Sequence, residues 1–311
     1  MYKTSTIFFF AWVCLLLGHN LELASAQPEI AGRNGSATEF FYHFYDVFNQ
    51  ADEDLIMELM YDPIFVIQDG RTPYQIPEGV RIWNFTQLIE TEGWAYSALD
   101  EEPVVIRESY STAIVSFSFS RYNDLDEKYF TSALYGVLSR QDGEWGWTLI
   151  VVPGPTINVS TEVNDGAIAG SAAIEAPETE LSASEYVQET FDILNKEKDI
   201  DKSMSVFGYP YYQIGSGLNS NYDVIMPDEG DHRQQLESDY SQGDRNGWSY
   251  SSLDELNVIS ESASQAIVAV DSTGYFRNGF TNRDRSVYYF VSKDEDGEWA
   301  VHALLFFPYW V

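Results

Sequence analysis

An arginine on an otherwise apolar strand is the residue that most suggests chemistry. Three apolar residues precede Arg121 at alternate positions and share its predicted strand face: Val115, Phe117 and Phe119. A guanidinium on an apolar face is unfavourable unless it is paired or faces a pocket. Arg121, and Arg277 in a comparable strand, could therefore bind a ligand carboxylate or carbonyl. The alternative, a local ion pair or an outward-pointing strand end, is favoured because paired arginines are commoner.

Two carboxylate pairs also recur, Asp100-Glu101 and Asp254-Glu255. Neighbours on an extended segment point to opposite sides, so neither pair is expected to act as a coupled acid and base. We interpret each pair as part of a solvated loop before a strand. The other residues that could line a pocket are aromatic or polar: Tyr45, Gln68, Asp69, Trp94, Tyr135, Tyr212, Trp248 and Tyr289. For the tryptophans, burial in the core is favoured over a pocket wall.

Metal and thiol chemistry have little support in this sequence. Its single cysteine, Cys14, lies in an apolar N-terminal run, and three of its histidines, His43, His232 and His302, are scattered without ligand spacing. The sequence therefore predicts no metal site and no cofactor.

The N-terminus has the three-part pattern of a secretory signal peptide. Lys3 precedes an apolar run from Ile7 to Leu17, and Ala24-Ser25-Ala26 places small residues before Gln27. An anchoring helix is the alternative, but the run is shorter than the roughly 20 residues that span a bilayer. We therefore predict a signal peptide at residues 1–26, a secreted or periplasmic protein, and no integral membrane segment after processing.

The chain is strongly acidic, with 49 Asp and Glu against 17 Lys and Arg and a formal charge of −32. Such a field repels nucleic acid, so no nucleic-acid partner is expected. A cationic partner could be attracted, but a solvated surface suited to saline surroundings is the favoured interpretation.

The sequence contains an internal repeat. Three segments recur in the same order at offsets of 154, 153 and 154 residues: Gly93–Glu101 as Gly247–Glu255, Glu108–Val115 as Glu261–Val268, and Asp142–Trp145 as Asp296–Trp299. This period is too long for a solenoid, so each copy is a domain. We predict a polar segment at 27–36, a first domain at 37–153, a linker at 154–182 rich in Ala, Pro, Ser and acids, and a second domain at 183–311.

Within the first copy the hydrophobic period changes from helical to alternating. Helical spacing runs through Phe40, Phe41, Phe44, Tyr45 and Phe48, and a second helix is predicted through Leu55, Leu59 and Met60. A strand at 64–67, a turn at Asp69-Gly70 and a helix at 85–91 follow. Four strands are then predicted at 104–106, 112–121, 129–139 and 145–152, with a hairpin turn at Asp142-Gly143. Helices followed by an antiparallel meander indicate an α+β fold.

This order, closed by an Asp-Gly-x-Trp hairpin, resembles the nuclear-transport-factor-2-like (SnoaL-like) superfamily over both predicted domains. Phe48-Asn49-Gln50 after the first helix, Gly93-Trp94 before the meander, and Asp142-Gly143-Glu144-Trp145 carry the resemblance. It implies two tandem NTF2-like cones, each with helices packed on a curved antiparallel sheet around an apolar pocket. Because members commonly pair, it also implies an intrachain pseudo-dimer or a homodimer.

The ketosteroid-isomerase-like members of this superfamily use a tyrosine on the first helix and an aspartate on the first strand. Here Phe44 or Thr190 falls at the tyrosine position, and Gln68 or Gly215 near the aspartate position. That activity is therefore not carried over to this chain, although Asp69 lies beside Gln68.

Binding of a small apolar ligand in a cone pocket is consequently the leading functional hypothesis. The alternatives are a SnoaL-like enzyme of the cyclase, isomerase or dehydratase type, and a non-catalytic protein-interaction module. Asn34, Asn84 and Asn158 fit the N-glycosylation pattern, which has meaning in a eukaryotic source.

If the N-terminal segment is a signal peptide, the protein exported by its own host begins near Gln27. N-terminal sequencing and intact-mass measurement of that protein check this. A chain that keeps the apolar run would show that the segment is an anchor.

Overall fold

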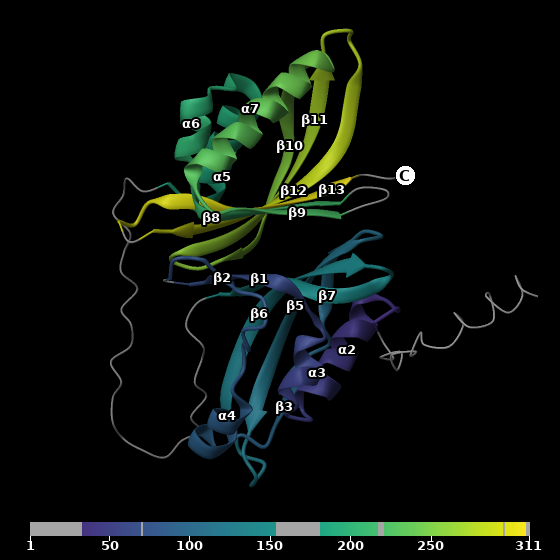
Figure 1. Cartoon of the computed structure of the whole chain (residues 1–311). Coiled ribbons are helices and arrows are strands. Elements are labelled where there is room, and N and C mark those ends of the chain that lie inside the picture. Colours follow the sequence, from purple (N-terminus) through teal and green to yellow (C-terminus); the bar gives the residue numbers. More distant parts are fainter. Residues whose placement is uncertain (1–32, 70, 154–180, 217–220, 295, 309–311) are drawn as a thin grey trace, which may run out of the picture. The chain divides into compact units, whose positions relative to one another are not determined.

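The structure is a computed structural model that describes residues 33–69, 71–153, 181–216, 221–294 and 296–308 (Figure 1). The predicted signal peptide and nearly all of the predicted linker lie outside these residues. Of the two compact units into which the chain divides, Met1–Ala31 and Gly32–Val311, the second contains every described element.

The first domain contains three helices and seven strands. Its helices are α2 (Ala37–Phe48), α3 (Glu53–Met57) and α4 (Phe85–Glu92). Its strands are β1 (Met60–Gln68), β2 (Tyr74–Ile76), β3 (Tyr96–Leu99), β4 (Val104–Glu108), β5 (Thr112–Tyr122), β6 (Lys128–Gln141) and β7 (Glu144–Val152). They form one sheet in the order β2-β1-β7-β6-β5-β3, and β4 also pairs with β5.

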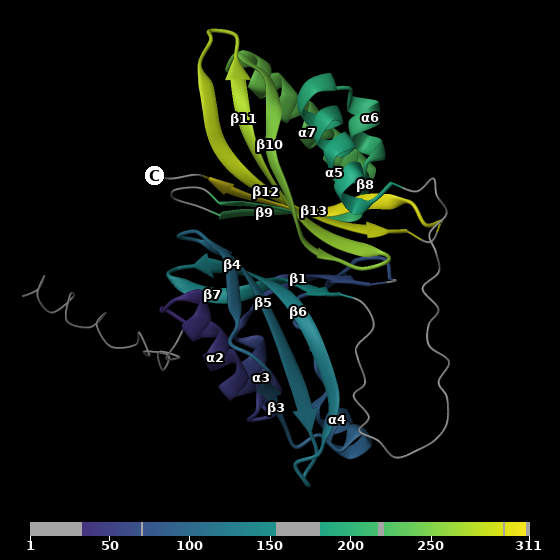
Figure 2. The same ribbon diagram turned by 180° about the vertical axis from the view of Figure 1, so that it is seen from behind.

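The second domain repeats this plan. Its helices are α5 (Ala183–Asp192), which continues into a π-helical turn (Ile193–Glu197), α6 (Ile200–Ser205) and α7 (Glu229–Arg245). Its strands are β8 (Phe207–Ser216), β9 (Asn221–Met226), β10 (Trp248–Glu261), β11 (Gln265–Phe276), β12 (Thr281–Lys293) and β13 (Trp299–Pro308), in the order β10-β11-β12-β13-β8-β9. In Figure 2 the long strands β10 to β12 bend, and the helices of this domain lie on one side of the sheet.

The first helix of each domain begins with the same capping box. Ser36 accepts a bond from the Glu39 amide at 3.2 Å, and the Glu39 carboxylate accepts one from the Ser36 amide at 2.8 Å. Ser182 and Glu185 repeat both bonds at 3.3 and 2.9 Å. Each box satisfies two amides that an α-helix leaves unpaired at its start, so both helices begin at equivalent residues.

The predicted α+β fold class with two sheet-bearing domains is confirmed, but each sheet is mixed. β1 pairs in parallel with β7, and β8 pairs in parallel with β13. The remaining pairs are antiparallel, and all except β3 with β5 join strands that follow each other in the chain. The predicted meander corresponds to β4 to β7. The parallel contacts were missed because a parallel partner is reached through a long crossover, which leaves no local pattern.

Two predicted elements differ from the structure. The second helix was predicted through Met60, but it ends at Met57, and Met60 is the first residue of β1. The boundary could not be predicted, because a short amphipathic helix and a strand can both bury the same apolar residues. No strand was predicted in the repeated segment that begins with Gly-Trp, yet β3 forms two residues after Trp94, and Trp248 is the first residue of β10.

The repeated segment makes the same hydrogen bonds in both domains. Trp94 Nε1 donates to Ser97 Oγ at 3.0 Å, and Trp248 Nε1 donates to Ser251 Oγ at 3.2 Å. These bonds join residues three apart along a strand start. Each bond holds the indole against the serine side chain three residues later, so both tryptophans have a structural role.

The aspartates of the repeated carboxylate pairs bind the neighbouring strand. Asp100 accepts from Ser120 Oγ at 2.6 Å, and Asp254 accepts from Thr273 Oγ1 at 2.6 Å. As predicted, Asp100 and Glu101 are exposed in a bend before β4. Asp254 and Glu255 are exposed as well, but they lie within β10, so the predicted loop is wrong for the second pair. The hydroxyl partners lie on β5 and β11, far along the chain, where local sequence could not reveal them.

The core of the first domain is built from aromatic rings on α2, β5 and β7. The ring of Phe41 lies 4.3 Å from Phe117 and 5.7 Å from Trp147, and Phe44 lies 5.3 Å from Trp147, measured between ring centroids. Gly136 on β6 makes room for this indole: a Cβ atom there would lie 1.7 Å from Trp147 Cζ3. A side chain at position 136 and an indole at position 147 thus exclude each other.

One buried apolar cluster takes residues from both sheets. Phe65 of β1 stacks on Tyr212 of β8 with ring centroids 5.4 Å apart, and Ile67, Ile214 and Leu305 belong to the same cluster. Among the described residues, no helix is long and apolar enough to span a bilayer.

We expect Gly136→Ala to destabilise the first domain by roughly 1–3 kcal/mol, because the added methyl group overpacks the core against Trp147. Urea unfolding followed by tryptophan fluorescence measures the loss.

The control is the pair that the second domain uses at the equivalent strand positions, Gly136→Tyr together with Trp147→Val. We expect this double variant to be more stable than Gly136→Tyr alone. Additive losses from the two single changes would show that the two positions do not share one space.

Candidate functional site

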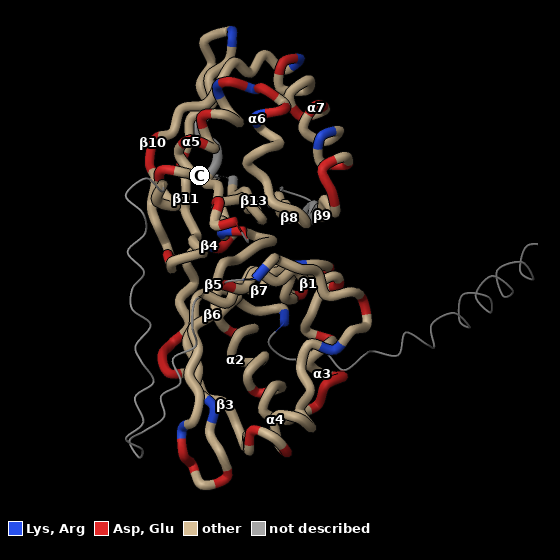
Figure 3. Tube along the Cα trace, turned by 90° about the vertical axis from the view of Figure 1, so that its left-hand side faces the viewer, with Lys and Arg blue, Asp and Glu red and all other residues tan. Residues whose placement is uncertain are grey.

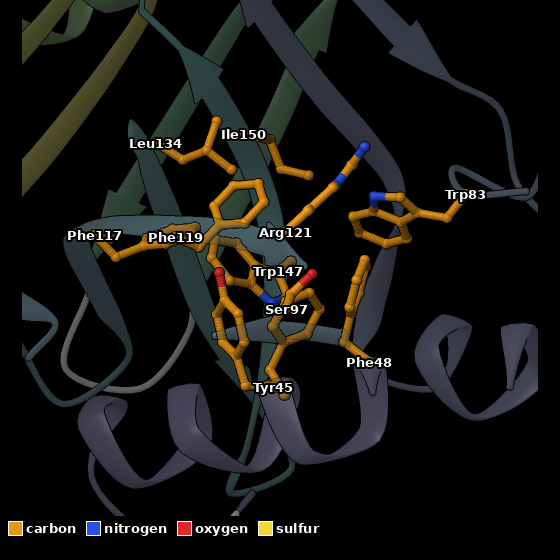
Figure 4. Close-up of a pocket in the computed structure, with 11 residues that line it drawn as sticks. Tyr45, Phe48, Trp83, Ser97, Phe117, Phe119, Arg121, Leu134, Trp147 and Ile150 are labelled. Atoms are coloured by element: carbon orange, nitrogen blue, oxygen red, sulfur yellow. The ribbon is translucent and has the colours of Figure 1, made fainter. Parts of the chain in front are cut away.

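The concave face of the first domain holds a small cavity of about 60 Å³ between α2 and the sheet (Figure 4). Its walls are mainly aromatic and are formed by Phe44, Tyr45, Phe48, Trp83, Ser97, Phe117, Phe119, Arg121, Leu134, Trp147 and Ile150. This volume has room for little more than a few water molecules, each of which occupies about 30 Å³ in the liquid.

Arg121 lies at this cavity but is already engaged. Its Nη1 atom is 2.9 Å from Glu92 Oε2, and its guanidinium lies 4.7 Å from the ring centroid of Phe130. Burial raises the pKa of the neighbouring Tyr45 hydroxyl, which therefore stays protonated. Of the predicted pocket residues in the first domain, these two line the cavity.

The second domain has a much larger cavity, of about 660 Å³, in the corresponding place. Its apolar and aromatic walls are Phe191, Leu194, Phe207, Tyr211, Leu236, Trp248, Phe276, Val287, Tyr289, Leu304 and Phe306. Its polar and small residues are Asn195, Gln213, His232, Gln235, Asp239, Tyr240, Gln242, Gly243, Asn246, Ser251, Ser272 and Gly274. The volume is within the range of about 300–1,000 Å³ that is usual for ligand pockets.

Strand register shows that the two cavities occupy equivalent positions. Arg121 pairs with Ser97 across β5 and β3, and Gly274 pairs with Ser251 across β11 and β10. Arg121 therefore corresponds to Gly274.

Smaller residues replace large ones throughout the second cone. The first-domain residues Phe44, Phe117, Phe119, Arg121 and Trp147 correspond to Thr190, Val270, Ser272, Gly274 and Val301. Each change removes side-chain volume from the concave face. Since the backbone plan is the same, the difference in cavity volume follows from these replacements.

One exchange runs in the opposite direction. Gly136 faces Val115 across the sheet, and Tyr289 faces Val268 at the equivalent position. The tyrosine ring therefore stands on β12 where the first domain has only backbone, and Val301 leaves it the space that the Trp147 indole takes in the first domain. The exchange puts a hydroxyl group into the second cone in place of an indole.

The helix beside the sheet also differs between the domains. α4 has 8 residues and buries Phe85 and Leu88, with Phe85 centred 5.0 Å from Phe48. α7 has 17 residues and buries only His232. A mostly polar helix thus borders the larger cavity instead of packing into it.

His232 is the best-defined polar group of this cavity. Its ring stacks on Tyr211 at 4.6 Å and meets the edge of Phe207 at 4.3 Å, and its Nδ1 atom lies 2.9 Å from the Tyr209 hydroxyl. The side chain is 3% exposed, and burial lowers its pKa to about 4. His232 is therefore neutral near pH 7. No local pattern indicated that His232 lines a cavity, since the residue lies in a polar stretch without ligand spacing.

Tyr289 supplies a second buried polar group. It is 2% exposed, and burial, with a smaller contribution from Tyr240, raises the pKa of its hydroxyl. No hydrogen bond joins this hydroxyl to another described residue. Trp248, also a predicted pocket residue, lines the same cavity.

The other predicted pocket residues lie elsewhere. Asp69 accepts a hydrogen bond from Ser262 Oγ at 3.0 Å, and the neighbouring Gln68 pairs with Val152 at the end of β1. Tyr135 and Tyr212 belong to the region of the cluster that both sheets share.

Trp94 and Arg277 have structural roles as well. Trp94 is buried and packs on Phe48 at 5.8 Å. Arg277 is exposed and lies 3.0 Å from Asp244. Within the part of the chain that the structure describes, no three acidic, histidine or cysteine side chains are grouped closely enough to hold a metal ion.

The similarity to known proteins that could be found is to solved structures. No family model matches the sequence, and no curated protein matches it. Among solved structures, a protein of unknown function with a cystatin-like fold from Nostoc punctiforme is 16% identical, with 42% of this chain and 95% of that chain covered and a TM-score of 0.31.

Two further structures give similar values. An NTF-2-like protein of unknown function from Pseudomonas aeruginosa is 15% identical, over 40% of this chain and 93% of that one, with a TM-score of 0.30. A ketosteroid-isomerase-like protein from Erwinia carotovora atroseptica is 14% identical, over 40% and 91%, with a TM-score of 0.29. The element order and the two described sheets agree with the α+β fold of two sheet-bearing domains that the sequence predicted.

We expect the second domain to lose stability as the pH falls from about 6.5 to about 4. The ordinary pKa of histidine is about 6.5 in an unfolded chain. Burial lowers the pKa of both His232 and His302 to about 4 in the folded protein, so the unfolded chain binds more protons between these values. The stabilisation is complete above pH 6.5 and is lost toward pH 4.

Hydrogen exchange of β11 to β13, corrected for intrinsic rates, measures this stability at pH 7 and pH 5. His302→Gln cannot titrate and should flatten the pH dependence by roughly 2–3 kcal/mol over the full window. If stability falls as steeply with pH in this variant as in the wild type, the pH dependence is not due to His302.

Proposed function

We propose that this chain is an exported tandem NTF2-like protein whose second domain binds one small, largely apolar molecule. The observation that carries the proposal is the cavity of about 660 Å³ in the second cone, against about 60 Å³ in the first. Its walls combine aromatic and aliphatic side chains with polar groups, as ligand pockets do.

The first domain has a different role in this proposal. Its concave face is occupied by Phe41, Phe44, Phe117 and Trp147, and its arginine is paired with Glu92. These contacts stabilise the domain but leave no room for a molecule of useful size. We therefore assign ligand binding to the second domain alone.

We also propose that the chain is its own pseudo-dimer and arose by internal duplication. The apolar cluster with members on both sheets, the stack of Phe65 on Tyr212, and the bond from Ser262 to Asp69 support this arrangement. The repeated hydrogen bonds of the Gly-Trp segment support the duplication. Secretion or periplasmic export remains a proposal that rests on the N-terminal sequence.

A SnoaL-like enzyme is the second candidate, and His232 is the observation in its favour. A neutral imidazole held by the Tyr209 hydroxyl at a cavity wall can take and return a proton. The extracted molecule separates the two candidates. A binding protein returns it unchanged after incubation, whereas an enzyme converts it.

We expect protein purified from its own host to retain one small apolar molecule per chain. Native mass spectrometry followed by organic extraction measures occupancy and mass. Ser272→Phe gives the second cone the residue type that the first has at Phe119, and it should lower occupancy at least tenfold because the ring takes up cavity space.

The matched control is Leu134→Phe, which places the same ring at the first cavity with less added volume and should leave occupancy unchanged. An empty wild-type protein, or equal occupancy in the Ser272→Phe variant, would contradict the proposal.

A further inference from the structure

The wall of the second-domain cavity limits the charge that a bound molecule can carry. Among the described residues that line it, Asp239 is the one charged side chain, and none is a lysine or an arginine. An anion would lose its hydration there without gaining a partner, and burial of an unpaired charge is strongly unfavourable.

A cation is not favoured either. Asp239 already accepts a hydrogen bond from Gln235 Nε2 at 2.9 Å, and both residues lie on α7, the mostly polar helix at the cavity. Figure 3 shows acidic residues distributed over both domains, so acidity is a property of the whole surface and does not mark this cavity. The Asp239 carboxylate therefore already has a hydrogen-bond partner in the protein and does not need a ligand to pair with it.

Of the neutral polar residues in the lining, Tyr289 and His232 are almost fully buried, and each keeps a polar atom for a ligand. Tyr289 has a buried hydroxyl that bonds to no other described residue. His232 has Nδ1 at the Tyr209 hydroxyl, and its other nitrogen, Nε2, bonds to no described residue. Because both residues line the cavity, these atoms can bond to water or to a bound molecule there.

Both groups also keep their neutral form over a wide pH range. Burial lowers the pKa of His232 and raises that of Tyr289. A neutral imidazole has one donor and one acceptor, and a tyrosine hydroxyl can do both. Such a pair is complementary to an uncharged oxygen rather than to a carboxylate or an ammonium group.

Resting on the proposed function, we propose that the molecule bound in the second cone is uncharged and carries a hydroxyl or carbonyl oxygen that bonds to Tyr289 or to His232. Its apolar body lies against the walls formed by Phe191, Trp248 and Leu304.

Four pyrene probes test this proposal on the full chain at pH 7.5: pyrene, 1-pyrenemethanol, 1-pyrenecarboxylate and 1-pyrenemethylammonium. Binding is measured by fluorescence titration. One added hydrogen bond should make the alcohol bind roughly threefold to tenfold tighter than pyrene. The carboxylate should bind at least about thirtyfold more weakly than the alcohol, because its charge is unpaired.

Two single-atom variants show whether the assigned residue is responsible. Tyr289→Phe removes the hydroxyl and keeps the ring, so it should abolish the preference for the alcohol over pyrene without weakening pyrene. Tyr288→Phe is the matched control: Tyr288 is the next residue on β12, belongs to the cluster shared by both sheets, and does not line the cavity. It should leave the preference unchanged.

The possible failures are distinguishable. Equal or tighter binding of the carboxylate or the ammonium probe would overturn this inference and leave the proposed function standing. A preference for the alcohol that survives Tyr289→Phe would overturn the role of Tyr289. If none of the four probes binds, the proposed function itself fails.

Discussion

A strongly curved sheet has a concave apolar face that must be covered, and this constraint governs both domains. Long antiparallel strands bend around a first helix, and side chains from the helix and the sheet must occupy the space between them. Because protein interiors are packed nearly as tightly as organic crystals, the size of each side chain on this face decides whether the space is closed or open. In the first domain Phe41, Phe44 and Trp147 close it.

The same scaffold therefore yields two different interiors. Equivalent capping boxes start the first helices, and equivalent indole–serine bonds fix the repeated Gly-Trp segment. These features hold the backbone constant, so changes on the concave face alter volume instead of fold. Thr190, Ser272 and Gly274 are too small to reach across the second cone, and the cavity remains. The exchange of Gly136 and Trp147 for Tyr289 and Val301 shows how bulk can move between adjacent strands.

Surface and interior of this protein differ in their electrostatics. The chain carries a formal charge of −32, yet the lining of the second cavity includes one carboxylate, which is bonded to Gln235. His232 and Tyr289 are neutral there because burial disfavours their charged forms. A dense acidic exterior and a neutral interior are compatible because solvated surface charges act weakly across a folded domain. The lining of the cavity is thus largely uncharged even in this strongly acidic protein.

The sequence by itself determined the repeat, the α+β class and most of the strands, because these depend on local periodicity and on residues such as Asp142-Gly143 that fix a turn. It also indicated four pocket candidates that do line a cavity. Tyr45 and Arg121 line the cavity of the first domain, and Trp248 and Tyr289 line that of the second. Only the tertiary structure decided that Arg121 pairs with Glu92, that Asp69 bonds to Ser262, and that His232 is a cavity residue. The physical reason is that each of these contacts joins different elements far apart in the chain. The sequence contains the replacements of large residues by small ones that enlarge the second cavity. These replacements could be recognised only once strand register had shown which positions of the two domains correspond.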